Sequence, residues 1–198
     1  TGGAYLYLDR SGSSLSYSTQ IYFQSAGVAD FGMGTSTGSA AAADWSFYNY
    51  GTAANIITIP RASGYVGIGT VAPAFPLQIN GNAAATAFVT TSDARLKKDV
   101  EPISAALSRV QQLRGVSFTW KPANEREVGK DLKLPTGERQ LGFIAQEVAT
   151  VVPEAVVTPK KGSTDPYALK EADLIPLLVE AIKELQTEVV QLQAKAGK

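Results

Sequence analysis

Ser92 and Lys97 are the two residues of this chain whose types and spacing could break a covalent bond. A serine hydroxyl attacks a carbonyl only when a base removes its proton, and a lysine amine can be that base only when its pKa falls from about 10.4 toward 7 or 8. Such a shift corresponds to about 4 kcal/mol, so a packed environment must remove the amine from water. The acyl group nearest to the Ser92 hydroxyl is the Thr91 carbonyl. The chemistry predicted is therefore self-cleavage of the Thr91–Ser92 peptide, once per chain.

The same residues also have an ordinary structural interpretation. Ser92 or Asp93 would cap free backbone N–H groups at the start of a helix or turn. Lys97 would then be a solvated surface charge. On residue types alone, this second interpretation is the commoner outcome for a lone serine and lysine pair.

The composition excludes several other kinds of site. The chain of 198 residues contains no cysteine and no histidine, and its formal net charge is zero. A Ser-His-Asp triad, a disulfide framework and a His- or Cys-ligated metal are thereby excluded, and we expect no metal and no cofactor. The neutral balance favours no nucleic-acid or membrane-surface binding, and no apolar run is long enough for membrane insertion. Because the sequence starts at Thr1, we expect it to be an excerpt of a longer protein.

Two differently built modules meet at Ser92. Residues 1–91 carry only five charged side chains, and residues 92–198 carry the other 31. So few charges are unusual for a soluble monomer and indicate burial between chains, as in fibre shafts. Aromatic and β-branched runs punctuated by small residues predict an all-β head over residues 1–62 with strands near 4–8, 20–24, 44–50 and 55–59. A thin, glycine-rich β neck over 63–91 follows, with a strand at 65–69.

The aromatic residues of the head support two hypotheses. Trp45, Tyr48 and Tyr50 could stack on a sugar ring of a cell-surface glycan. Aromatic residues at alternate positions of strands more often fill a core or a subunit interface. The second role is the commoner one.

The second module reads as a mixture of short helices and strands. Pro102 is expected to begin a helix that ends at Gly115. Polar residues 121–139 predict an exposed loop between a strand at 116–120 and a strand at 140–143. A short helix at 145–151 and a small hairpin formed by 155–158 and 167–169 complete the module.

The strongest periodic signal is a helix over about residues 171–196. Its apolar residues recur at spacings of three and four, which predicts a coiled-coil seam formed by Ile175, Leu178, Ile182, Leu185, Val189 and Leu192. β-Branched residues alternating with leucine lean toward a parallel dimer. The alternative to a seam is an amphipathic helix that packs on its own domain.

Several separated motifs in this half resemble the intramolecular chaperone domain of phage endosialidases and tail fibres, also classed as the S74 self-cleaving peptidases. The resemblance covers about residues 90–198, in the segments 92–100, 116–120, 141–148 and 152–154, and in Tyr167 ahead of the leucine-rich helix. It implies a domain that trimerises, drives folding of the preceding β-rich fibre and is then cut off by a Ser/Lys dyad. It implies Ser92 as nucleophile, Lys97 as base and Thr91–Ser92 as the bond cut.

The expected architecture is therefore an α+β chaperone domain ending in a coiled-coil helix, preceded by an all-β, trimeric fibre-type head and a thin β neck. The domains are 1–62, 63–91 and 92–198. We expect the C-terminal part of a homotrimeric phage tail fibre or tailspike, or of a bacterial surface fibre, located outside the cell. Any enzyme activity would be single-turnover self-cleavage.

Two alternatives remain at this point. The chain could be a permanent, non-cleaving trimeric adhesin tip that binds a cell-surface receptor or glycan. A regulatory role follows from animal membrane-tethered transcription factors with the same domain. The missing basic patch and membrane span disfavour that second alternative.

Overall fold

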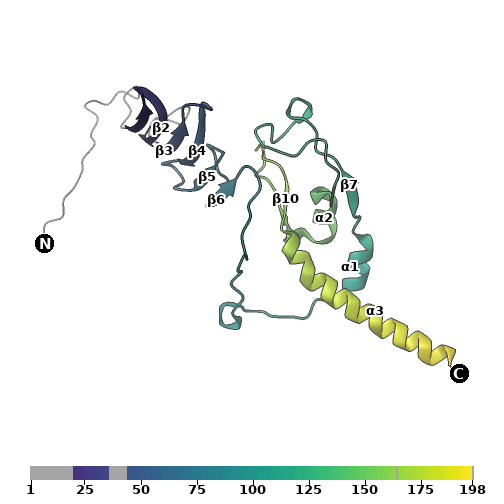
Figure 1. Cartoon of the computed structure of the whole chain (residues 1–198). Helices are drawn as coiled ribbons and strands as arrows, with labels where there is room; N and C mark the ends of the chain where they lie inside the picture. The colour runs from purple at the N-terminus through teal and green to yellow at the C-terminus, as the bar shows by residue number, and fades with distance from the viewer. Residues whose placement is uncertain (1–19, 36–43, 164, 198) are drawn as a thin grey trace. The chain divides into compact units, whose positions relative to one another are not determined.

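The computed structural model of the chain describes residues 20–35, 44–163 and 165–197 (Figure 1). The strand expected at 4–8 lies outside these residues. The chain divides into two compact units, one holding the residues up to Thr86 together with Asp131–Lys133, the other holding Ala87–Lys130 and the residues from Leu134 onward. Each unit is described by itself below.

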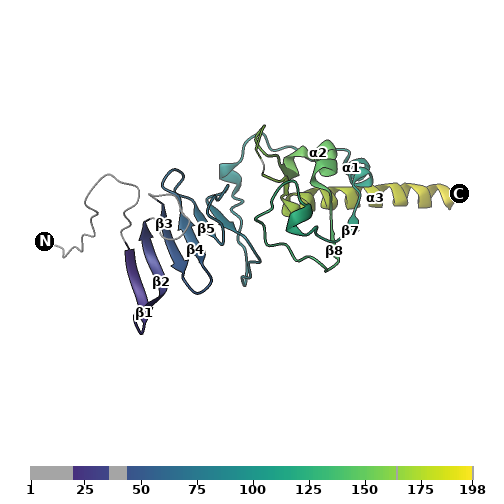
Figure 2. The same cartoon turned by 90° about the horizontal axis from the view of Figure 1, so that it is seen from above.

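A six-stranded sheet makes up the first unit, with its strands in sequence order (Figures 1 and 2). Neighbouring strands run antiparallel from β1 to β5, and β5 and β6 are parallel. The strands are β1 (Gln20–Ser25), β2 (Val28–Thr35), β3 (Trp45–Asn49), β4 (Ala54–Ile59), β5 (Val66–Ile68) and β6 (Leu77–Ile79). The N-terminal β-sheet region expected from the sequence is therefore confirmed.

Local residue chemistry explains the first hairpin. Ala26 and Gly27 join β1 to β2, and both have positive φ angles of 50° and 80°. Two central residues with positive φ make the tight turn whose twist matches that of antiparallel strands. Strand β2 was not anticipated, because its alanine, glycine and aspartate weaken the β signal of its sequence.

One face of the sheet carries an apolar row that crosses all six strands. Directly paired residues lie on the same face, so the register places Ile21, Met33, Phe47, Ile57, Ile68 and Ile79 in that row. Ile21, Ile68 and Ile79 are each more than a third exposed. The opposite face holds a buried row of small residues that includes Ser46 and Thr58.

The sheet continues across residue 62, where a boundary between head and neck was expected. Thr58 of β4 pairs with Gly67 of β5, and a Cβ at Gly67 would lie only 2.3 Å from the Thr70 backbone oxygen. Glycine is required there by close backbone approach. The division into head, neck and chaperone stays a prediction.

The second unit combines three α-helices with two small antiparallel sheets. β7 pairs with β8, and β9 pairs with β10. The elements are α1 (Ala106–Gln112), β7 (Val116–Phe118), β8 (Gln140–Gly142), α2 (Ala145–Val151), β9 (Val156–Val157), β10 (Ala168–Leu169) and α3 (Leu174–Ala196). An α/β segment that ends in a long helix was expected and is confirmed.

The start of α1 differs from the prediction. The helix begins after Ala105 and not at Pro102, because Ala105 has a left-handed conformation with φ 52°. The carboxylate of Glu184 on α3 accepts hydrogen bonds from the backbone N–H groups of Ala106 and Leu107, at 3.0 and 2.8 Å. A side chain 78 residues away thus caps the helix, which sequence-local reasoning could not detect.

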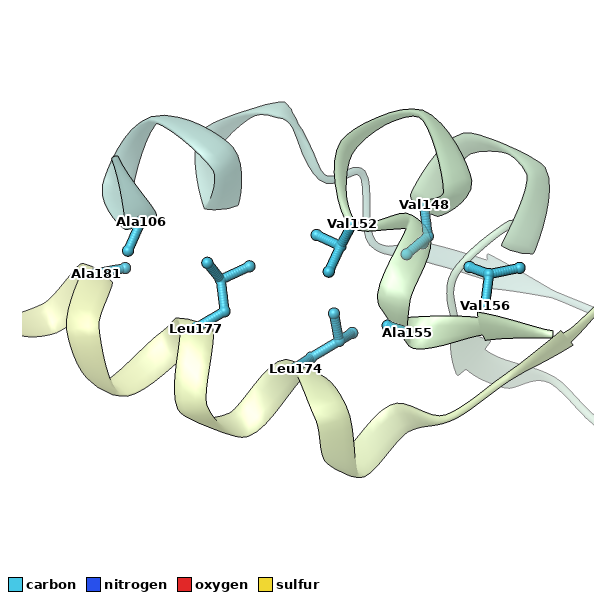
Figure 3. Close-up of a cluster of buried hydrophobic side chains, with 8 residues drawn as sticks. All are labelled: Ala106, Val148, Val152, Ala155, Val156, Leu174, Leu177 and Ala181. Carbon is cyan, nitrogen blue, oxygen red and sulfur yellow. The ribbon is translucent and has the colours of Figure 1, made fainter. Parts of the chain in front are cut away.

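The core of this unit lies between α1, α2 and the first half of α3 (Figure 3). It contains Ala106, Val148, Val152, Ala155, Val156, Leu174, Leu177 and Ala181, none of them more than 8% exposed. Ala106 faces Ala181 where α1 crosses α3, and these small side chains let the two helices approach closely. Arg109 of α1 also donates to the Val151 carbonyl of α2 at 3.3 Å.

Candidate functional site

The structure brings Ser92 and Lys97 into direct contact. Lys97 Nζ donates a hydrogen bond to Ser92 Oγ at 2.8 Å. The residues between them form a single 3-10 turn, Ala94–Leu96, which is closed by a bond from Lys97 N to the Ala94 carbonyl at 3.1 Å. A nucleophile and a base at this distance satisfy the first geometric requirement of general-base catalysis.

Asp93 caps this turn and forms an ion pair with Arg95. The Asp93 carboxylate accepts from the backbone N–H of Arg95 at 2.9 Å and from its Nε at 3.1 Å. These hydrogen bonds, with the side-chain bond first in importance, hold the pKa of Asp93 below its usual value. The sequence indicated Asp93 as a possible cap but did not predict its ion pair with Arg95.

The segment that carries the site lies open to solvent. Within residues 87–102 every residue is exposed except Asp93, which is half-buried. Four large apolar side chains flank the Thr91–Ser92 bond and are 74–94% exposed: Phe88, Val89, Leu96 and Val100. Burial within the single chain therefore does not supply the desolvation that a lysine base needs.

Helix α3 presents two adjacent apolar stripes. Leu174, Leu177 and Ala181 are buried in the core of their own unit. The six residues of the predicted seam all lie outside that core and are 43–64% exposed: Ile175, Leu178, Ile182, Leu185, Val189 and Leu192. One part of the helix thus packs on its own domain, while the described residues of the chain leave about half of each seam side chain exposed.

An apolar groove lies beside the seam stripe. Glu101, Pro102 and Ile103 form one wall, and the first turns of α3 with Ile175 and Val179 form the other. Glu101 and Pro102 end the exposed segment that holds Ser92 and Lys97, and Ile103 follows it. The chain leaving the candidate cleavage site is therefore attached to the helix that carries the seam.

The three aromatic residues proposed for glycan stacking do not share one surface. Trp45 and Tyr48 are three positions apart in β3, so they lie on opposite faces of the sheet. Tyr48 and Tyr50 contact each other with ring centroids 4.9 Å apart, and Tyr22 joins them at 5.8 Å from Tyr50. Burial and a hydrogen bond with Tyr22 raise the pKa of Tyr50 to about 12. Tyr22 was not anticipated as a member, because its strand partners cannot be read from sequence.

The described residues hold no cluster of three or more metal-ligating side chains. Within the same part of the chain, no helix combines the length and the apolar character required to cross a membrane.

Comparison with known proteins identifies the second unit. Residues 92–157 match the family model of Peptidase S74, whose description is chaperone of endosialidase. Two similar curated proteins are the long tail fiber proteins Gp37 of Enterobacteria phage K3 and Enterobacteria phage T2. Both are 35% identical over 106 residues, or 52% of this chain, and these residues cover 8% and 7% of the two fibre proteins.

The chain therefore contains a chaperone-of-endosialidase domain of the Peptidase S74 family, beginning at Ser92. The family resemblance drawn from the sequence motifs is confirmed. The chain spans less than a tenth of the length of the tail fibre proteins that it matches.

Proposed function

We propose that this chain is part of a homotrimeric fibre protein of a phage tail or a bacterial surface, in which residues 92–198 act as an intramolecular trimerisation chaperone. The observation that carries this proposal is the seam stripe on α3, whose six apolar residues stay 43–64% exposed. The first three of them, Ile175, Leu178 and Ile182, directly follow the buried residues Leu174, Leu177 and Ala181. An apolar stripe of this spacing is stabilised by packing against equivalent helices. A family match and two tail fibre relatives support fibre assembly as its purpose.

Assembly through α3 would promote folding of the sheet by mass action. Three joined helices raise the effective concentration of the segments attached to them, which offsets the entropy lost when strands of different chains pair. The apolar row of the sheet and the scarcity of charges in residues 1–91 support contacts between chains in that region. The fibre would then form from the helix toward the sheet.

Self-cleavage follows assembly in this proposal. Neighbouring chains would cover Phe88, Val89, Leu96 and Val100, and so remove Lys97 from water. Lys97 Nζ would then take the Ser92 hydroxyl proton while Oγ bonds to the Thr91 carbonyl carbon. The Thr91–Ser92 C–N bond breaks as the proton passes to the Ser92 nitrogen, which leaves an ester. Water hydrolyses this ester to a Thr91 carboxylate and a free Ser92 hydroxyl.

Cleavage would make the assembled fibre kinetically stable, because the domain that assisted its folding is gone.

A second candidate function is a permanent, non-cleaving trimeric adhesin tip for a cell-surface receptor or glycan. The exposure of Lys97 favours it, since the single chain lacks the burial that a lysine needs to act as a general base. No nucleic acid, membrane insertion, metal or cofactor is part of either function.

The test is to express the whole chain and weigh its products by mass spectrometry. The proposal expects two pieces divided between Thr91 and Ser92, and a single intact chain for Ser92→Ala and for Lys97→Ala. Lys98→Ala is the matched control, because this neighbouring lysine has no contact with Ser92 and should leave cleavage in place. An intact parent chain in trimers of native mass would favour the permanent adhesin.

A further inference from the structure

The ion pair within the turn at the cleavage site has no part in the chemistry described so far. Three nitrogens of Arg95 donate to the Asp93 carboxylate: the backbone N at 2.9 Å, Nε at 3.1 Å and Nη2 at 2.6 Å. The Asp93 carboxylate thus caps the turn and also accepts hydrogen bonds from two side-chain nitrogens of Arg95. It is unusual on a segment that otherwise lies in solvent, where isolated ion pairs contribute little.

The first effect of the pair is on position. The turn Ala94–Leu96 brings residue 97 back toward residue 92, and Asp93 satisfies the free N–H group at the start of that turn. Without an acceptor at residue 93, the backbone of this exposed segment gains conformations in which Lys97 Nζ lies far from Ser92 Oγ. A general base acts only within about 2.6–3.2 Å of the group that it deprotonates.

The second effect is on charge. A free carboxylate next to Ser92 would stabilise the ammonium form of Lys97, which cannot accept a proton. Arg95 holds that carboxylate in a neutral pair. The other charged groups facing this site lie on the same segment: Lys98 and Asp99, which pair with each other at 3.8 Å, and Glu101. Residues 94–102 are exposed, so the rest of the single chain leaves this segment uncovered.

We propose that Asp93 and Arg95 are positioning residues of the self-cleavage site. Asp93 closes the turn that holds Lys97 against Ser92, and Arg95 keeps the Asp93 carboxylate from holding Lys97 protonated. This inference rests on the proposed self-cleavage and adds to it two residues that are neither the nucleophile nor the base.

The experiment measures the cleavage rate of the whole chain as a function of pH. The chain is held uncut in denaturant, folding is started by dilution into buffers from pH 6 to 10, and the two pieces are quantified on denaturing gels. The fraction cut during expression in cells at neutral pH is a second measurement that does not depend on refolding. Circular dichroism checks that each variant folds.

Arg95→Met leaves the Asp93 carboxylate unpaired. We expect the midpoint of the rate profile to move up by about half to one pH unit, which slows cleavage about three- to tenfold below the midpoint. The double variant Asp93→Asn with Arg95→Met removes the charge but keeps a side-chain acceptor for the turn. Its midpoint should return to that of the parent, which a merely structural role of Arg95 would not cause.

Asp93→Ala removes the cap and should slow cleavage about tenfold at every pH. If Asp93→Ala fails to fold, the double variant still tests the charge effect of Arg95. The matched control is Lys98→Met with Asp99→Asn, which removes the neighbouring ion pair and should leave the midpoint within about 0.2 units of the parent.

Distinct outcomes separate this inference from the function on which it rests. A parent chain that is never cut overturns self-cleavage and the two positioning roles together. A parent that is cut, with Arg95→Met showing the parental rate and midpoint, overturns the positioning roles alone. A double variant whose midpoint stays as high as that of Arg95→Met overturns the charge effect of Arg95.

Discussion

At the scale of single residues, the second unit depends on contacts between parts of the chain that lie far apart in sequence. Arg114, just after α1, donates through Nε to the Glu147 carboxylate of α2 at 3.1 Å. This bond lowers the pKa of Glu147 below its usual value, and the pKa of Arg114 rises because of the same partner. The pair therefore connects two helices that pack on the same core.

The lowered pKa of Glu147 predicts a pH dependence of stability. A carboxyl group with a depressed pKa in the folded state contributes stability above its unfolded pKa, about 4.3, and loses it as the pH falls through the folded value. The unfolding free energy of Glu147→Gln should fall below that of the parent at pH 7, and the difference should disappear as the pH falls below the lowered pKa that Glu147 has in the folded state. Urea unfolding at a fixed protein concentration measures this difference. A parent-minus-variant difference that is constant with pH would contradict the prediction.

At the scale of elements, the first half of α3 carries two adjacent apolar stripes, one buried and one exposed. Leu177 is 2% exposed and packs in the core of its own unit, whereas its neighbour Leu178 is 44% exposed on the seam stripe. Two adjacent leucines of the same helix thus differ sharply in burial. They give a matched pair for separating folding from assembly.

Leu177→Ala should destabilise the folded unit by about 2–5 kcal/mol at any protein concentration, because it leaves a cavity in the core. Leu178→Ala should weaken assembly instead, so its effect on unfolding should grow with protein concentration. Urea unfolding at several concentrations, with sedimentation to measure mass, distinguishes the two. Equal behaviour of the two variants would argue against a division of α3 into two stripes.

The sequence predicted the elements with strong local signals and missed those fixed by distant partners. The long α3 was predicted from its apolar spacing, and most strands of the first unit from their aromatic and β-branched residues. The short α2 was predicted with its observed bounds, 145–151. The start of α1 was placed too early because its cap comes from Glu184, which lies on another helix. The Ser92 and Lys97 pair was predicted from residue types. The ion pair of Arg95 with Asp93 was not predicted, because it depends on the backbone turn that orients the two side chains.

At the scale of the whole molecule, the proposed cleavage and the proposed assembly depend on each other. The single chain leaves both the seam stripe and the segment 87–102 uncovered. Lys97 would therefore become an effective base only after neighbouring chains cover it. Loss of the seam should remove cleavage even though Ser92 and Lys97 are unchanged.

The double substitution Leu185→Asp with Leu192→Asp tests this dependence. Buried charges on the seam should convert trimers to monomers and reduce cleavage at Thr91–Ser92 by at least tenfold, measured by native mass spectrometry and denaturing gels. Thr187→Asp with Ala194→Asp, on the opposite side of the same helix, is the control that should remain trimeric and cut. Full cleavage in a monomeric variant would refute the dependence of cleavage on assembly.

Among the described residues, Glu184 makes the last hydrogen bond between α3 and another element, and all described residues from Leu185 onward are exposed. The end of the helix is thus structurally separable from the domain that it serves. Residues 185–196 could be replaced with a coiled-coil helix of known oligomeric state whose heptad register continues from Ile182. The result should be a module that can be transferred to other proteins. Grafted to a different β-rich protein, such a module would set how many copies of that protein come together.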